Sequence, residues 1–175
     1  MRKCIGVLVF LLLLFSAATA LCQGGPAEGT ITDEEYGIYR LVVAKLEGRC
    51  SVDQETLAGV GIDPGAMSAA GIQIDADIIK DYNEKNIKKR TLAAAFVHAM
   101  TPGSGDGLEG RKKATFSRIG FDRQKRRALL IMGITLYYPE DVMNEGKYVL
   151  LEKKTEKWTI IHWTSAWKMQ LGLIH

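Results

Sequence analysis

Three histidines, His98, His162 and His175, are the side chains of this sequence that change charge near neutral pH. His162 is the strongest candidate for chemistry. Its neighbours Trp158 and Ile160 place it in an apolar segment, where one imidazole could serve as a general base or orient a ligand. A structural imidazole, bonded only to protein groups, is the alternative and the simpler interpretation. The sequence identifies no Asp or Glu partner for His162, which argues against catalysis.

Other patterns associated with catalysis or cofactors are incomplete. Ser104 lacks the G-x-S-x-G elbow of a nucleophilic serine, and Cys50 has no adjacent histidine. Residues 105–110 fit G-x-G-x-x-G, but a dinucleotide site needs a strand before and a helix after the glycines. Asp75 and Asp77 would point about 200° apart on a helix, so they cannot chelate one ion together. We therefore expect no catalytic residue, no metal site and no cofactor.

The first twenty residues are typical of a signal peptide. Met1-Arg2-Lys3 is basic, residues 5–15 are apolar apart from Gly6, and residues 18–20 are the small residues that a signal peptidase accepts. We expect cleavage after Ala20 and a mature chain that is secreted or periplasmic. A retained membrane anchor is the alternative, disfavoured because residues 16–20 become small and polar.

Two cysteines remain in the predicted mature chain, because Cys4 leaves with the signal peptide. In an oxidising compartment Cys22 and Cys50 could form one disulfide, which is the favoured prediction. Two free thiols stay open as an alternative, because spacing does not fix connectivity. Lipid anchoring at Cys22 is disfavoured, because Leu21 stands where a lipoprotein signal carries a small residue.

Size and composition indicate one globular domain after the leader. The 175 residues are 47% hydrophobic and 25% charged, which excludes a disordered chain, a coiled coil and a polytopic membrane protein. Removing Arg2 and Lys3 leaves 21 basic residues against 20 acidic ones. We therefore expect no nucleic-acid partner and no stable membrane insertion after cleavage. Basic clusters at 88–90, 111–113 and 123–127 are interpreted as solvated surface, with an anionic polymer or lipid surface as the alternative.

The first half of the predicted domain, residues 32–175, is expected to be helical and to follow a Gly/Pro-rich linker at residues 21–31. Thr32 and Glu35 match a capping box. The helix that they start buries residues at helical spacing, namely Tyr36, Tyr39, Val43 and Leu46, and it ends at Gly48.

A second helix is expected from Asp75 to Lys89. Its apolar residues are Ile78, Ile79, Tyr82 and Ile87. Residues 91–100 fit a third helix or a strand. Glycines and prolines predict loops at residues 51–74 and 101–110.

The second half is rich in β-branched and aromatic residues at 114–121, 127–137, 147–154 and 157–167, which predicts an antiparallel meander. In the last hairpin we expect Lys153 opposite Trp158. Continuing that register pairs Leu151 with Ile160, Leu150 with Ile161, Val149 with His162 and Tyr148 with Trp163. Both faces would then be apolar and at least partly covered.

The predicted fold class is therefore α+β: N-terminal helices followed by a four-stranded antiparallel meander. Residues 117–121 (SRIGF), Ala128-Leu129, residues 148–153 (YVLLEK) and Lys157-Trp158 form a recurring pattern. The pattern is similar to that of small, secreted, uncharacterised bacterial proteins with an S-R-x-G-F…A-L…Y-x-L-L-E-K…K-W core. The helix-then-sheet order also resembles the cystatin-like superfamily, including polyketide cyclase-like pocket proteins, whose enzymes carry an Asp–His pair.

The functional expectation is an exported binding or interaction module for a small apolar ligand or a partner protein, in preference to an enzyme. The candidate ligand-binding residues are His162, Trp158 and Arg118, because they combine an apolar strand face with two polar groups. Arg118 would need an acceptor if buried, and both Glu152 and a ligand anion are open. The alternative is a small lyase, isomerase or hydrolase that uses His162 as a general base in a sheet-lined pocket.

Overall fold

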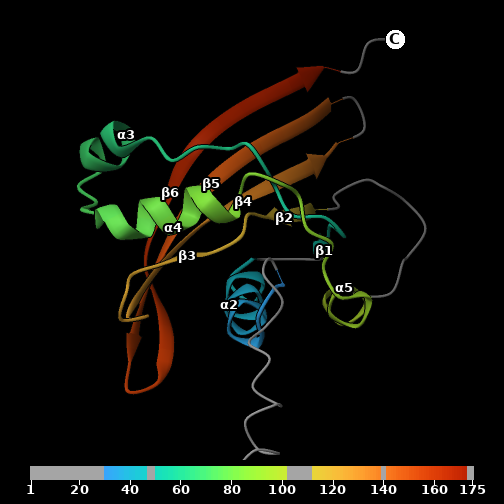
Figure 1. Ribbon diagram of the computed structural model, residues 1–175. Helices are drawn as coiled ribbons and strands as arrows, with labels where there is room; N and C mark the ends of the chain where they lie inside the picture. Colours follow the sequence, from blue (N-terminus) through green and yellow to red (C-terminus); the bar gives the residue numbers. More distant parts are fainter. Residues whose placement is uncertain (1–29, 47–49, 102–111, 139–140, 173–175) are drawn as a thin grey trace, which may run out of the picture. The chain divides into compact units, whose positions relative to one another are not determined.

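The computed structural model describes residues 30–46, 50–101, 112–138 and 141–172, with the side chains of residues 171 and 172 left out (Figure 1). The chain divides into two units between Thr30 and Ile31, and the description concerns the second unit. The predicted signal peptide, Cys22 and most of the predicted linker lie outside the described residues. So do His175 and nearly all of the loop expected at 101–110.

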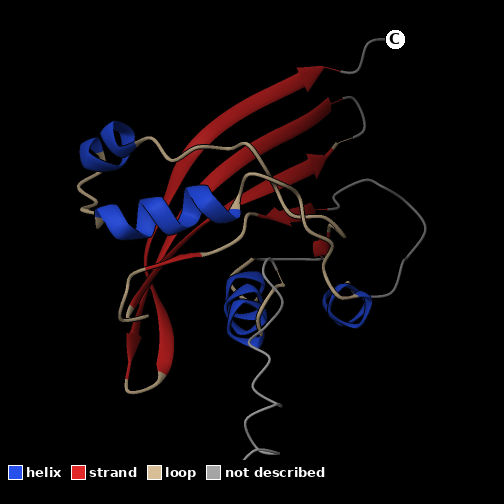
Figure 2. Ribbon diagram, viewed as in Figure 1, coloured by secondary structure: helices blue, strands red, loops and turns tan. Residues whose placement is uncertain are grey.

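Within the described residues the second unit is an α+β structure, as the sequence predicts (Figure 2). Its elements, in chain order, are α2 (Asp33–Val43), β1 (Cys50–Val52), α3 (Pro64–Ala69), α4 (Ala76–Lys85), α5 (Ala94–Met100), β2 (Lys112–Phe116), β3 (Gly120–Phe121), β4 (Arg127–Tyr137), β5 (Asp141–Lys154) and β6 (Lys157–Gly172).

The strands form one six-stranded sheet, where the sequence predicted four strands. The order is β1-β2-β4-β5-β6, with β3 also paired to β4; only β1 and β2 are parallel. The predicted strand 114–121 is split into β2 and β3. The Ser117 amide still donates to Ile131 on β4, but the backbone amide and carbonyl of Arg118 bond to the Asn86 side chain. Most of β1 and all of helix α3 lie in the segment 51–74 that was expected to be loop. The three residues of β1 are too few to show a strand period, and the six of α3 are too few to show a helical one.

Helix α2 begins as its capping box predicts. The Thr32 hydroxyl accepts from the Glu35 amide at 3.2 Å, and the Glu35 carboxylate accepts from the Thr32 amide at 2.9 Å. Residues 94–100 are helical, which resolves the open choice between helix and strand at 91–100.

Helix α4 is shorter than predicted. Its N-cap residue Asp75 makes no capping bond and pairs with Arg127 at 2.7 Å. The helix ends at Lys85 because the next residue, Asn86, turns inward and donates to two carbonyl groups. Ile87 therefore lies outside the helix with 72% of its surface exposed, and the expectation that it is buried is wrong.

Helices pack on both faces of the sheet, so each is at least partly covered, as the apolar residues on both sides of the last hairpin predicted. One core joins α2 and α5 to even-numbered β4 residues such as Leu130 and to Val149 on β5. The other core joins α3 and α4 to odd-numbered β4 residues such as Leu129 and to Leu150 on β5. We call these the α2 face and the α4 face of the sheet.

The last hairpin follows the predicted register only near its turn. Lys153 lies opposite Trp158, and Leu151 opposite Ile160, as expected. Beyond that the ladder shifts by one residue, so Leu150 faces His162 and Val149 faces Trp163. Ile161 is the extra residue of a β-bulge, which a continuous alternation cannot anticipate. The expected pairs Leu150–Ile161, Val149–His162 and Tyr148–Trp163 are therefore wrong.

Candidate functional site

Arg118 is a buried structural residue in this fold. Its Nε donates to Glu35 Oε1 at 2.8 Å and its Nη2 donates to Glu35 Oε2 at 3.0 Å, a bidentate pair. The two side chains are 4% and 1% exposed. The acceptor in this bidentate pair is Glu35, from the first turn of α2. The sequence left Glu152 and a ligand anion open, and neither is the acceptor in this pair.

The electrostatics of this pair favour the charged forms. Burial by itself raises the pKa of the Glu35 carboxyl, but the hydrogen bonds and charge of Arg118, with the backbone amides of Thr32 and Ile119, lower it below its ordinary value. Burial lowers the pKa of Arg118, and Glu35 more than reverses this, so the net pKa is raised. The guanidinium stays charged and ties the start of α2 to the segment between β2 and β3.

The neighbours of Arg118 in the SRIGF segment are structural as well. Ser117 accepts from the Ile131 amide through its hydroxyl at 2.8 Å, and the Arg118 amide donates to the Asn86 side chain at 2.7 Å. A Cβ on Gly120 would lie 2.6 Å from the carbonyl oxygen of Ile78. The segment therefore holds α2, α4 and β4 together at close range.

Trp158 is half-buried beside the turn of the last hairpin. Its indole nitrogen donates to Glu34 Oε1 at 3.2 Å, and the same oxygen accepts from Lys153 at 3.1 Å. The Trp158 ring packs against Phe121 with centroids 5.8 Å apart. Trp158 and Arg118 thus both bond to the first turn of α2, through consecutive glutamates.

His162 lies apart from these two candidates. The bulge at Ile161 places it opposite Leu150, a residue of the α4-face core, and its side chain is exposed. In the described part of the chain no hydrogen bond or ion pair joins the His162 side chain to another residue. The three candidates predicted from sequence therefore do not converge on one site.

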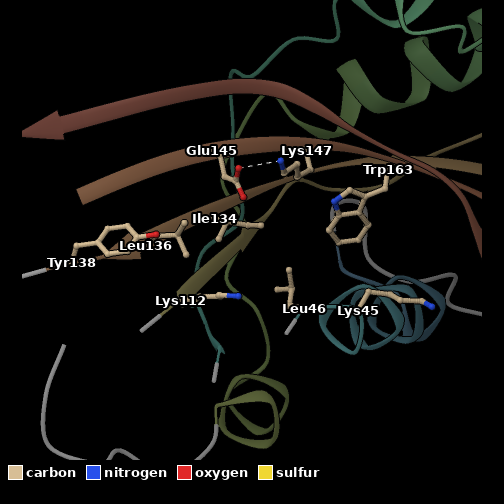
Figure 3. A pocket seen from close by; sticks show the side chains of 9 residues that line it. All are labelled: Lys45, Leu46, Lys112, Ile134, Leu136, Tyr138, Glu145, Lys147 and Trp163. Carbon is tan, nitrogen blue, oxygen red and sulfur yellow. Dashed lines mark ion pairs between the residues drawn. The ribbon is translucent and has the colours of Figure 1, made fainter. Parts of the chain in front are cut away.

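An open cavity of about 370 Å³ lies on the α2 face, and sequence analysis had not assigned it (Figure 3). Its lining comes from six segments of the fold: Lys45 and Leu46 after α2, Lys112 on β2, Ile134 and Leu136 on β4, Tyr138 just after β4, Glu145 and Lys147 on β5, and Trp163 on β6.

The strands that line the cavity are longer than helix α2. The 14 residues of β5 span about 46 Å at the rise of a strand. The 11 residues of α2 span about 16 Å. Helix α2 therefore covers only part of its face of the sheet and leaves a stretch of β4 and β5 open.

The floor of the cavity combines apolar and charged side chains. Ile134, Leu136 and Trp163 pack against the edge of the α2-face core. Beside them Lys147 and Glu145 form an ion pair at 3.0 Å, with each side chain 20% exposed. Apolar and charged side chains therefore line the same open cavity.

Trp163 reaches this cavity only because of the bulge. The predicted register placed it on the face of Tyr148 and Leu150, which is the α4 face. With Ile161 bulged, Trp163 moves opposite Val149 and joins the α2 face. One feature of the sequence points toward the site. The apolar run in residues 127–137 is longer than one short helix can cover.

A second, apolar hollow of about 330 Å³ lies on the α4 face, lined by Val60, Asn144, Trp167 and Met169. Trp167 donates from its indole nitrogen to Asn144 Oδ1 at 3.0 Å, and its ring covers Gly146. Only one polar side chain, Asn144, lines it. We use it below as a control surface.

Two further observations concern the described residues alone. No group of His, Cys, Asp and Glu side chains among them could hold a metal ion. None of their helices has the length and hydropathy to cross a membrane.

Cys50 is buried in β1, which raises the pKa of its thiol. Its pairing with Cys22 stays a prediction, because Cys22 lies outside the described residues.

Comparison with protein-family models, with curated proteins and with solved structures finds no match for this chain. The resemblances stated from the SRIGF pattern and from the order of elements stay predictions. The cavity and the leader sequence are therefore the features of this chain that bear on its function.

Proposed function

We propose that this protein is an exported single-domain binding module that holds a small, partly apolar ligand in the cavity beside Trp163. The observation that carries the proposal is the open stretch of sheet on the α2 face, where Ile134, Leu136 and Trp163 adjoin the Glu145–Lys147 ion pair. Export rests on the leader at residues 1–20.

The binding experiment uses N-phenyl-1-naphthylamine, a neutral apolar fluorophore, titrated into the purified protein. Trp163→Ala should weaken binding by about tenfold or more, because loss of a hot-spot aromatic side chain in a pocket costs about 2 kcal/mol or more. Trp167→Ala is the matched control. It removes the same side chain from the same strand, also half-buried, but from the hollow on the α4 face.

Only a selective loss supports the proposal. If both tryptophan variants weaken the fluorophore equally, it binds exposed apolar surface in general and the proposal fails. It also fails if the fluorophore does not bind, or if Trp163→Ala leaves binding unchanged in a protein that unfolds at the same temperature.

Export is tested separately on protein recovered from cells that express the full sequence. The intact mass should correspond to residues 21–175, with two hydrogens fewer if Cys22 and Cys50 are bridged. An uncleaved chain, or a lipid mass on Cys22, would contradict this part of the proposal.

The alternative, an enzyme with His162 as general base, gains no supporting observation. A general base needs hydrogen-bond access to a substrate held in a pocket, and an orienting partner. His162 lies outside the lining of the Trp163 cavity and has no partner among the described residues.

A further inference from the structure

The two ends of the sheet differ in length. The sheet ends on one side in β1, which has three residues, and on the other side in β6, which has 16 (Figure 1). One side of the β6 backbone pairs with β5, and the other side has no described strand beside it. β6 contains no proline, aspartate or glutamate. The unpaired N–H and C=O groups of such an edge are a template for another strand.

Two bulges limit where a second strand could pair with β6. Ile161 and Ala166 are extra residues relative to β5, and each interrupts the regular ladder. After Ala166 the pairing with β5 is regular from Trp167 to Gly172. The regular part of the edge is therefore the end of the strand, residues 167–172.

The same stretch carries an exposed apolar surface. Trp167 and Met169 line the apolar hollow on the α4 face, and Met169 is 51% exposed. The Trp167 ring lies over Gly146 and its indole nitrogen bonds to Asn144, so the hollow is formed before any partner binds. An added strand gains affinity from backbone hydrogen bonds and specificity from pockets for its side chains. Residues 167–172 offer both.

We propose that this edge pairs with the same edge of a second copy of the chain. The two β6 strands would lie antiparallel about a two-fold axis and join the two sheets into one. Because the contact uses the same surface on both copies, it closes after two and does not continue into a fibre. The inference goes beyond the proposed function and does not depend on it, because the contact uses the sheet edge and the α4 face.

Symmetry limits the register of the proposed pair. The axis keeps the two α4 faces on the same side of the joined sheet, and opposite residues of an antiparallel pair point to the same face. The axis must therefore pass beside one residue of each strand. At Lys168 it would set two ammonium groups opposite each other, which is unfavourable. At Met169 it brings the two Met169 side chains together and sets Lys168 opposite Gln170, so we expect the axis at Met169.

Sedimentation velocity of the purified protein over a wide range of concentrations tests the inference. We expect a monomer–dimer equilibrium. Met169→Lys should weaken the dimer by about tenfold or more, because it sets two ammonium groups opposite each other. Ile161→Lys is the matched control. It makes the same kind of change at another exposed apolar residue of β6, but outside the paired stretch, so it should leave the dimer unchanged.

Cross-linking tests the register. Met169→Cys should give a disulfide-linked dimer under mild oxidation, because directly opposite Cβ atoms lie about 4.5–5.5 Å apart. Peptide mass mapping should find the bond between the two introduced thiols. Gln170→Cys is the control. Gln170 is the next residue and is also exposed, but it would lie opposite Lys168 and should cross-link much less.

Several results would overturn the inference. One is a protein that is monomeric at every concentration, which would leave the edge to a segment of another protein. Others are a dimer that Met169→Lys leaves unchanged, a dimer that both lysine substitutions weaken equally, and equal cross-linking of the two cysteine variants. Met169 and Ile161 are exposed, so both lysine variants should fold, and their melting temperatures check this. None of these results bears on the proposed function, which depends on Trp163 on the other face.

Discussion

Two ends of the α2 face use charged residues in opposite ways. At the closed end, around Glu35 and Arg118, the charges are buried and joined in a bidentate pair. At the open end, around Lys147 and Trp163, the charges border a cavity of about 370 Å³. The same sheet face thus carries a structural polar cluster and a candidate binding site.

A conspicuous sequence motif therefore need not mark a binding site. The SRIGF segment is the most distinctive pattern in the second half of the chain. Its polar groups bond to residues of α2 and β4 and to the residue that ends α4. The cavity residues belong to no motif. Their role depends on which part of the sheet the helices leave open.

The largest expected effect comes from breaking the closed end. Arg118→Met should destabilise the protein by about 3–5 kcal/mol, because it leaves the Glu35 carboxylate buried without its partner. Urea unfolding measures the loss. The double variant Glu35→Leu with Arg118→Met should recover much of it, since a buried pair replaced by apolar groups is often neutral. If Arg118→Met leaves the free energy of unfolding unchanged but abolishes dye binding, our assignment of Arg118 as a structural residue is wrong.

A smaller effect is expected from the tight contact behind the same motif. Gly120→Ala should destabilise the protein by about 1–3 kcal/mol, because the added Cβ would meet backbone and Cβ atoms of α4. Gly37→Ala is the control. Gly37 is an exposed residue within α2 with nothing within 4 Å of a new Cβ, so the change should stabilise by about 0.5–1 kcal/mol. If both changes have the same sign, the close packing at Gly120 is not what we describe.

The pH dependence of the free energy of unfolding distinguishes the contribution of the Glu35–Arg118 charges from that of apolar packing. The folded pKa of Glu35 is lowered, so its stabilisation is complete above the ordinary carboxyl value of about 4.3 and is lost as pH falls through the folded pKa. We expect the difference in unfolding free energy between the protein and Glu35→Gln to be constant near neutral pH and to narrow below about pH 4. A difference that stays constant to pH 2 would show that the carboxylate charge contributes nothing.

The smallest effect is expected at His162. Because the side chain is exposed and bonds to no other described residue, His162→Ala should change stability by less than about 0.5 kcal/mol. It should leave N-phenyl-1-naphthylamine bound as in the unaltered protein, unlike Trp163→Ala. If His162→Ala loses dye binding, His162 belongs to the ligand-binding site after all, and the enzyme alternative gains support.

Local features of the chain could be predicted from the sequence because they depend on near neighbours. The capping box of Thr32 and Glu35 formed as expected, and β4 has the predicted bounds, residues 127–137. The turn of the last hairpin also fixed the pairing of Lys153 with Trp158. In each case the stabilising contacts join residues a few positions apart, or alternate at the period of a strand.

Tertiary structure alone decided which residues share a site. The partner of Arg118 is 83 residues away in Glu35, and no spacing rule connects them. One bulged residue, Ile161, put Trp163 and His162 on the faces opposite to those expected, because a shift of one residue exchanges the faces of a strand. The cavity opened where long strands extend beyond a short helix, and that mismatch exists only once the elements are packed together.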